Sequence, residues 1–183
     1  MAHQAIETRI KPRLFCYYQY MNKVNLLFIA KSTVIYSLAY LVVGGIAYQL
    51  ITKQFYIGEE PIFTAFMRNE ANVYEWAHVN LWLLPGLLLR GLLISTVISF
   101  FRTALKDMSF KKRVGLFFLV IFILTHFAAA APSPSNIEGL VYMKPELISL
   151  KSFLLTQPEM IAQSLLFALG LSWILNKPKK KIR

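Results

Sequence analysis

Apolar residues in this chain fall into four long blocks, separated by shorter stretches that carry nearly all of the charge. The blocks cover residues 26–51, 76–101, 114–131 and 157–175, and none of them alternates as a barrel strand would. About 20 apolar residues in helical form cross the core of a bilayer, which admits only helices or closed barrels. The pattern therefore predicts an all-α integral membrane protein, with four transmembrane helices bundled in a single membrane domain over residues 1–183.

The charge between the blocks predicts how these helices are oriented. Basic residues dominate the arm of residues 1–24, the loop of residues 102–113 and the tail of residues 176–183, whereas the other two loops are slightly acidic. Under the positive-inside rule, the basic flanks lie in the cytoplasm. We therefore expect both termini to be cytoplasmic, and the membrane to be a bacterial inner (plasma) membrane.

Composition narrows the classes of function. Hydrophobic residues make up 56% of the chain, too many for an ordinary soluble domain of 183 residues. The formal net charge of +11 lies almost wholly beside the apolar blocks, which points to topology and not to nucleic acid. The single Cys16 excludes an internal disulfide and a multi-cysteine metal site, and the three histidines are too scattered to predict one. We expect no cofactor and no metal.

The basic ends of the chain predict contact with anionic lipid. The arm interleaves four basic residues with four aromatic ones, which is typical of a segment lying at a membrane surface, and the tail carries five more basic residues. The plainer alternative is that both ends only fix the orientation. Lys31 lies close enough to the cytoplasmic end of the first block for its amine to reach the interface, so no function is assigned to it.

The outer loops are predicted to hold short interfacial helices. Residues 59–61, two acids and a proline before an apolar stretch, resemble a helix start. Two pairs have the spacing of a capping box, Ser135 with Glu138 and Thr156 with Glu159. The first pair predicts a helix over residues 136–143. The second predicts that the fourth span begins near residue 157.

The second block carries helix-breaking and charged residues inside its apolar run. Pro85 cannot donate a helical hydrogen bond, so we predict a hinge at Pro85 and Gly86 that opens the outer half of the bundle. The carbonyl that the proline leaves unpaired needs a partner, for which His78, Asn80 or water are candidates. Arg90 follows within the same run, where an unpaired arginine costs at least ~2.5 kcal/mol on insertion scales.

A depth count places Arg90 in a polar layer. Arg90 lies 12 residues from Arg102, His126 lies 12 from Val114, and Gln163 lies 13 from Asn176. With the cytoplasmic ends aligned, all three lie at a depth of roughly 18 to 20 Å at the helical rise of ~1.5 Å per residue. We predict a shared binding layer of Arg90, His126 and Gln163. The alternative is that Arg90 bonds to carbonyls, to Gln163 or to an outer-loop acid and only holds the bundle together.

Small residues repeat every four positions on two of the blocks. Such ridges let helix backbones approach closely, and the two ridges lie at matching depths on helices that run in the same direction. We therefore predict that the second and fourth spans pack together. The ridges are Gly91, Ser95 and Ser99 on the second block, and Ser164, Ala168 and Ser172 on the fourth.

Three hypotheses about function follow. The preferred one is a non-enzymatic accessory, assembly or binding component of a membrane complex, with a protein partner or self-association through the small-residue faces. The second is a small oligomeric transporter or channel for an anionic solute, with Arg90 as the attracting charge and Pro85 as the hinge. The third is a membrane enzyme at the outer face using His78, Glu138 or Glu159, against which the lack of catalytic motifs weighs.

Overall fold

The computed structural model describes residues 2–59 and 61–176, with side chains from residue 25 onward. The chain is 79% helical, and no strand occurs in the described ranges. Its long helices are α1 (Ala2–Ala47), α3 (Val73–Phe100) and α7 (Leu150–Ile174). The segments Asn25–Thr52, Val73–Phe100 and Leu150–Ile174 are long and apolar enough to cross a membrane. The all-α membrane class is therefore supported, with three such helices in the described part of the chain.

The third predicted span, residues 114–131, corresponds to two shorter helical pieces. The α-helix α5 (Phe110–Leu119) runs without interruption into the π-helical η3 (Val120–Phe127). A second π-helical stretch, η1 (Tyr48–Thr52), ends the first long helix and leads into α2 (Gln54–Ile57). The remaining elements are the 3-10 turn η2 (Ile62–Ala65), α4 (Arg102–Asp107) and α6 (Ile137–Tyr142).

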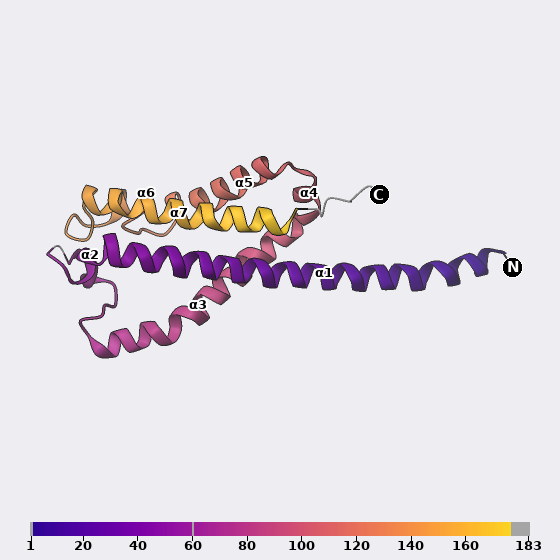
Figure 1. The fold of residues 1–183 in the computed structure, drawn as a ribbon, viewed down its shortest axis with the longest axis horizontal. Coiled ribbons are helices and arrows are strands. Elements are labelled where there is room, and N and C mark those ends of the chain that lie inside the picture. The colour runs from indigo at the N-terminus through magenta and orange to yellow at the C-terminus, as the bar shows by residue number, and fades with distance from the viewer. Residues whose placement is uncertain (1, 60, 177–183) are drawn as a thin grey trace, which may run out of the picture.

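Helix α1 is the centre of the arrangement. It lies between α3 and α7 and packs against both, while α5 covers another side of α7 (Figure 1). The loop with α4 and the end of α7 lie at one end of the bundle, and α2 and α6 lie at the other (Figure 1). Residues 2–24, which were expected to lie along the membrane surface, continue α1 as one helix beyond the bundle (Figure 1). A helix already nucleated by an apolar span extends at little cost, which accounts for the continuation.

The predicted packing of the second span on the fourth is wrong. The ridge of α3 faces α1, because a Cβ added at Gly91 would lie 3.2 Å from the Thr33 carbonyl oxygen of α1. Ser95 is fully buried on the same side, while Ser99 is half-buried and donates to the Thr96 carbonyl. The ridge of α7, Ser164, Ala168 and Ser172, is completely buried. Both ridges are used for close packing, but α1 separates the two helices.

Two helix starts differ from the capping-box predictions. Helix α7 begins at Leu150, because Ser149 and Ser152 each accept a hydrogen bond from the other's backbone N–H at 3.0 Å. Thr156 lies within the helix and donates to the Phe153 carbonyl, so it caps nothing. Helix α6 matches the predicted position, but its cap is Asn136, whose Oδ1 accepts from the Gly139 N–H at 2.8 Å. Serine and asparagine cap as well as the predicted pairs, which is why spacing alone misplaced the start of α7 and named the wrong cap for α6.

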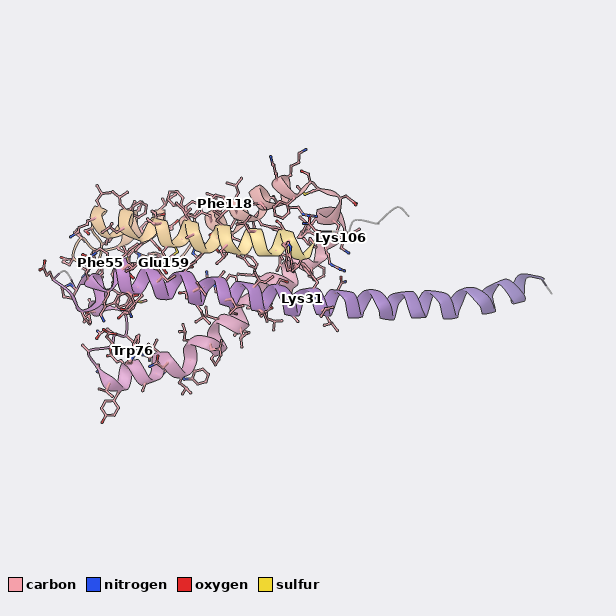
Figure 2. All side chains as sticks on the ribbon, in the orientation of Figure 1. Lys31, Phe55, Trp76, Lys106, Phe118 and Glu159 are labelled. Atoms are coloured by element: carbon pink, nitrogen blue, oxygen red, sulfur yellow. The ribbon has the colours of Figure 1, made fainter. Side chains whose placement is uncertain are left out.

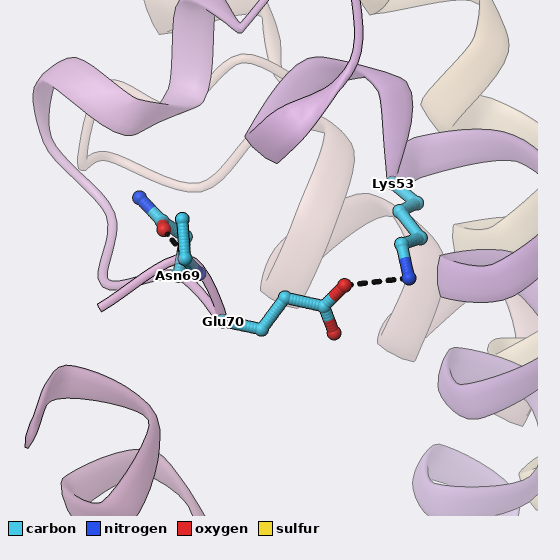
Figure 3. Close-up of polar contacts among 4 residues, drawn as sticks. Lys53, Asn69 and Glu70 are labelled. Atoms are coloured by element: carbon cyan, nitrogen blue, oxygen red, sulfur yellow. Dashed lines mark hydrogen bonds and ion pairs between the residues drawn. The ribbon is translucent and has the colours of Figure 1, made fainter. Parts of the chain in front are cut away.

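The outer loop between α2 and α3 is fixed by polar and aromatic contacts. The Lys53 ammonium forms a 2.5 Å ion pair with Glu70, and the neighbouring Asn69 accepts from the Ala71 N–H at 2.9 Å (Figure 3). The Tyr48 ring stacks on Trp76 with centroids 6.2 Å apart. The start predicted at residues 59–61 leads into η2, although residue 60 lies outside the described residues. These contacts tie the beginning of α3 to the end of the first long helix.

At the opposite end, two arginines join the helices. Arg113 is only 3% exposed and donates to the carbonyl oxygens of Leu105 and Leu175, both at 3.4 Å, and to the Asn176 side chain. A cation among carbonyls that end two helices also complements their dipoles. Arg102 donates to the Asn25 side chain at 3.2 Å. The predicted basic tail lies largely in residues 177–183, outside the described residues.

Candidate functional site

A glutamate and a glutamine one turn apart form the polar centre of the half of the bundle that lies toward α2 and α6. The Gln163 Nε2 donates to the Glu159 Oε1 at 2.8 Å, and Gln163 is only 5% exposed. Gly44 of α1 makes room for the pair, because a Cβ there would lie 3.3 Å from Gln163 Nε2 and 3.4 Å from Glu159 Oε1. Figure 2 shows Glu159 on α7 at the side of α1. Glu159 is therefore an interior carboxyl group and not the helix cap that its spacing predicted.

A small cavity lies beside this pair. It has a volume of about 10 Å³ and is lined by residues of α1, η3 and α7, among them Tyr36, His126, Gln163 and Ser164. The Tyr36 hydroxyl, the Gln163 Oε1 and the Ser164 hydroxyl are buried and have no hydrogen-bond partner among the described residues. A cavity of roughly 10–15 Å³ holds one water when polar groups surround it. The cavity thus has the size and the free polar atoms for a single water, and not for a larger solute.

Arg90 lies at the edge of this group. Its guanidinium carbon lies 5.9 Å from the centroid of the Tyr36 ring, a cation–π distance. No ion pair joins Arg90 to a carboxylate in the described part of the chain. Two members of the predicted layer, His126 and Gln163, line one cavity, and Arg90 reaches it through Tyr36. The Tyr36 ring also meets Phe167 edge-on at 5.3 Å, so α1, α3 and α7 converge at this ring.

His78 and Asn80 lie apart from this group. Both are exposed on the outer half of α3, where the His78 ring lies 6.4 Å from the Trp82 ring. Helix α3 remains helical through Pro85 and Gly86, but every residue from Val73 to Gly86 is exposed or half-buried. Burial begins at Leu87 and recurs at Gly91, Ser95 and Ile98. The predicted hinge residues therefore lie directly before the part of α3 that is buried, and α3 diverges from α1 toward its N-terminal end (Figure 1).

The helix types near the cavity are unusual. His126 lies within the π-helical η3, and the π-helical η1 ends the helix that carries Tyr36 and Tyr40. π-helical turns are rare and frequently occur at functional sites, because they shift side chains out of the α-helical register. The sequence reasoning gave no role to Tyr36 or Tyr40. The detectable signal was the Glu159–Gln163 spacing, which places two polar side chains on one helical face of an apolar block.

No protein-family model matches the chain, and comparisons with curated proteins and with solved structures find no match.

Proposed function

We propose that this chain crosses a membrane four times with both termini in the cytoplasm. Support comes from the three long apolar helices and from the joined α5 and η3, whose 18 residues extend roughly 25 Å, close to the ~30 Å core of a bilayer. The basic loop with α4 and the end of α7 lie at one end of the bundle, as four crossings require (Figure 1). The positive-inside rule assigns that end to the cytoplasm.

Cysteine labelling tests this topology. In a Cys16→Ser background, Leu140→Cys places a thiol on the outer helix α6, and Lys111→Cys places one at the start of α5. We expect a membrane-impermeant maleimide to label position 140 in intact cells and position 111 only after the membrane is permeabilised. Equal labelling of both positions in intact cells would overturn the four-span assignment.

Within the membrane, we propose that the chain is a non-enzymatic assembly component that binds a transmembrane helix of another protein. The observation that carries this proposal is the stretch of α3 from Ala77 to Gly86, beyond the contact of Trp76 with Tyr48, in which no residue is buried. Asn80 lies about 10 Å along α3 from Val73, a position that reaches into the hydrocarbon region of a helix of this length. A polar side chain facing lipid alone loses its hydrogen bonds.

The side chains exposed on this part of α3 indicate what kind of partner would cover it. Leu81, Trp82 and Leu84 offer an apolar face, with Leu81 67% exposed, and His78 and Asn80 add hydrogen-bonding groups to the same half of α3. A lipid acyl chain packs against the apolar face but cannot form a hydrogen bond with the Asn80 side-chain amide. A partner helix carrying a hydroxyl, amide or carboxyl side chain satisfies both.

Site-specific photo-crosslinking tests the partner. A photoreactive residue at Leu81 should give one discrete adduct with a different membrane protein, which mass spectrometry then identifies. The matched control is Leu119, which is 56% exposed on α5 and should give no such adduct. The adduct should weaken several-fold in an Asn80→Leu variant and form again from the two purified proteins in liposomes. Adducts with lipid only, or with a second copy of this chain, would overturn the proposal.

The position of Arg90 favours a second candidate, an oligomeric pathway for an anionic solute. Arg90 faces an aromatic ring and no described carboxylate, so its charge is available to an anion that enters beside α3. The cavity of about 10 Å³ is too small for passage through one chain, so the pathway needs several copies. Chloride and phosphate flux into liposomes tests this candidate. It fails if neither anion crosses, or if Arg90→Gln leaves the flux unchanged.

The outer-face enzyme has less support. His78 is exposed on the outer half of α3, whereas Glu138 begins α6, which lies on the other side of α1 (Figure 1). Glu159 is the only one of the three that lies near the cavity. The three side chains do not converge on a common point where a substrate would react.

A further inference from the structure

A second cavity lies at the end of the bundle that carries α4. It has a volume of about 100 Å³ and is lined by Leu27, Phe28, Lys31, Arg102 and Ile174. Three segments of the chain supply these residues: α1, the start of α4 and the end of α7. The volume is several times the roughly 10–15 Å³ that one water needs. Two cations therefore share a cavity with three apolar side chains.

One of these cations is held in place by its neighbours. The Arg102 guanidinium carbon lies 5.4 Å from the centroid of the Phe28 ring, and its Nη1 donates to the Asn25 Oδ1 at 3.2 Å. A guanidinium that stacks on a ring and is bonded at its edge is held in one orientation. The position of the charge is thus set before any ligand arrives, which reduces the entropy lost on binding.

Lys31 supplies the other charge. It follows Leu27 and Phe28 by one helical turn, so all three lie on the same side of α1. Lys31 is exposed and forms no ion pair with a described side chain. Figure 2 shows Lys31 where α1 leaves the bundle, at the same end as Lys106. Its amine has no internal counter-charge and remains available to an anion.

We propose that this cavity binds the phosphate of an anionic phospholipid in the cytoplasmic leaflet. Two cations of different helices match a phosphate, a group that arginine and lysine both recognise through charge. Leu27, Phe28 and Ile174 provide an apolar floor, which suits a ligand that carries acyl chains and is not needed by a free ion. Basic cavities between transmembrane helices on the cytoplasmic side are sites of this kind. The inference rests on the proposed topology, which places this end in the cytoplasm.

Native mass spectrometry of the delipidated full chain in detergent micelles tests the site. Dioleoyl phosphatidylglycerol and dioleoyl phosphatidylcholine are added separately. We expect a one-to-one complex with phosphatidylglycerol at concentrations where phosphatidylcholine does not bind. Lys31→Gln should lower the affinity about fivefold, as expected for losing one basic residue near an anionic headgroup. Because Lys31 is exposed, this variant tests the site without removing core packing.

Matched control variants distinguish binding in the cavity from a general attraction of the lipid to positive charge. Lys111→Gln and Lys112→Gln remove the same charge from exposed positions at the same end and should leave the affinity within twofold. Arg102→Lys keeps the charge but loses the planar donors, and should weaken binding. The proposal is overturned if all lysine variants lose affinity equally, if both lipids bind alike, or if equimolar inorganic phosphate displaces the lipid. The cysteine-labelling result is independent of these outcomes, so failure of the site and failure of the topology are distinguishable.

Discussion

Gly91 of α3 faces the ring of Tyr36 of α1 so closely that a Cβ on the glycine would lie 3.1 Å from Tyr36 Cδ1. The guanidinium of the preceding residue, Arg90, lies over the same ring. The Tyr36 ring therefore takes part both in the close packing of α1 on α3 and in the cation–π contact with Arg90. This close contact between the two helices lies next to the one arginine of the second apolar block.

The first prediction concerns the close contact of Gly91 with α1. Gly91→Ala should lower the free energy of unfolding by about 1 kcal/mol, since the new methyl group must displace a ring edge and a backbone carbonyl. Gly86→Ala is the matched control, because a Cβ at Gly86 meets nothing within 4 Å. That control should be neutral or stabilise the helix by up to about 1 kcal/mol. Thermal unfolding in detergent measures both, and equal effects would contradict the close contact.

The Gln163–Glu159 hydrogen bond makes a second prediction. Gln163→Leu removes the donor to an interior carboxyl group and should cost about 1–3 kcal/mol of stability. Glu159→Gln keeps an acceptor for the same donor and should cost less. In the double variant Glu159→Leu/Gln163→Leu, part of the loss should return, because neither polar group remains unpaired. Purely additive losses would show that the pair does not interact.

Arg113 makes a third prediction. Arg113→Met should destabilise the protein by about 2 kcal/mol or more, because the carbonyls of Leu105 and Leu175 lose a buried charged donor. Lys112→Met is the control, since its exposed neighbouring side chain makes no comparable contact. Chemical unfolding in mixed micelles compares them. If the two variants had similar free energies of unfolding, the hydrogen bonds of Arg113 would not contribute to joining the helices.

The fourth prediction concerns the loop before α3 at alkaline pH. The hydrogen bond with Glu70 raises the pKa of Lys53, and burial raises the pKa of Tyr56 to about 12 from its ordinary 10.0. Both groups hold their protons more tightly in the folded state. The contribution of the Tyr56 phenol to stability is therefore complete below pH 10 and is lost as the pH rises through 12, and the raised pKa of Lys53 acts in the same direction. We expect the loop to loosen in that window.

Fluorescence of Trp76 reports this transition, because the indole stacks on Tyr48. Replacing Trp82 and Trp173, both exposed, with phenylalanine leaves Trp76 as the single reporter. In this background, Tyr56→Phe should shift the alkaline change of emission upward or reduce its amplitude. A change of emission that is the same with and without the Tyr56 hydroxyl would contradict the assignment.

The sequence was most informative about the positions of the long helices, which follow from apolar runs, and about which polar residues lie at similar depths along those helices. The runs predicted the three long helices, and depth counting predicted that His126 and Gln163 share a level, which the common cavity shows. The pairing of helices was not predictable, because a ridge such as that of Gly91 fits any partner that offers a matching surface. The interior position of Glu159 was missed for a related reason. A hydroxyl-x-x-glutamate spacing is the same within a helix as at its start, and only the Ser149 cap distinguishes the two.

The contacts of Arg113 also have a consequence for biogenesis. This arginine is made 62 residues before Leu175, the carbonyl of which it binds. The earlier helices α1 and α3 already pack on each other, whereas α5 finds its main partner only in α7. During synthesis, a chain that has not yet reached Leu175 therefore has α1 and α3 available to pack on each other, while Arg113 has only the Leu105 carbonyl of its three partners. The last helix to leave the ribosome therefore supplies both the packing surface for α5 and the remaining partners of Arg113.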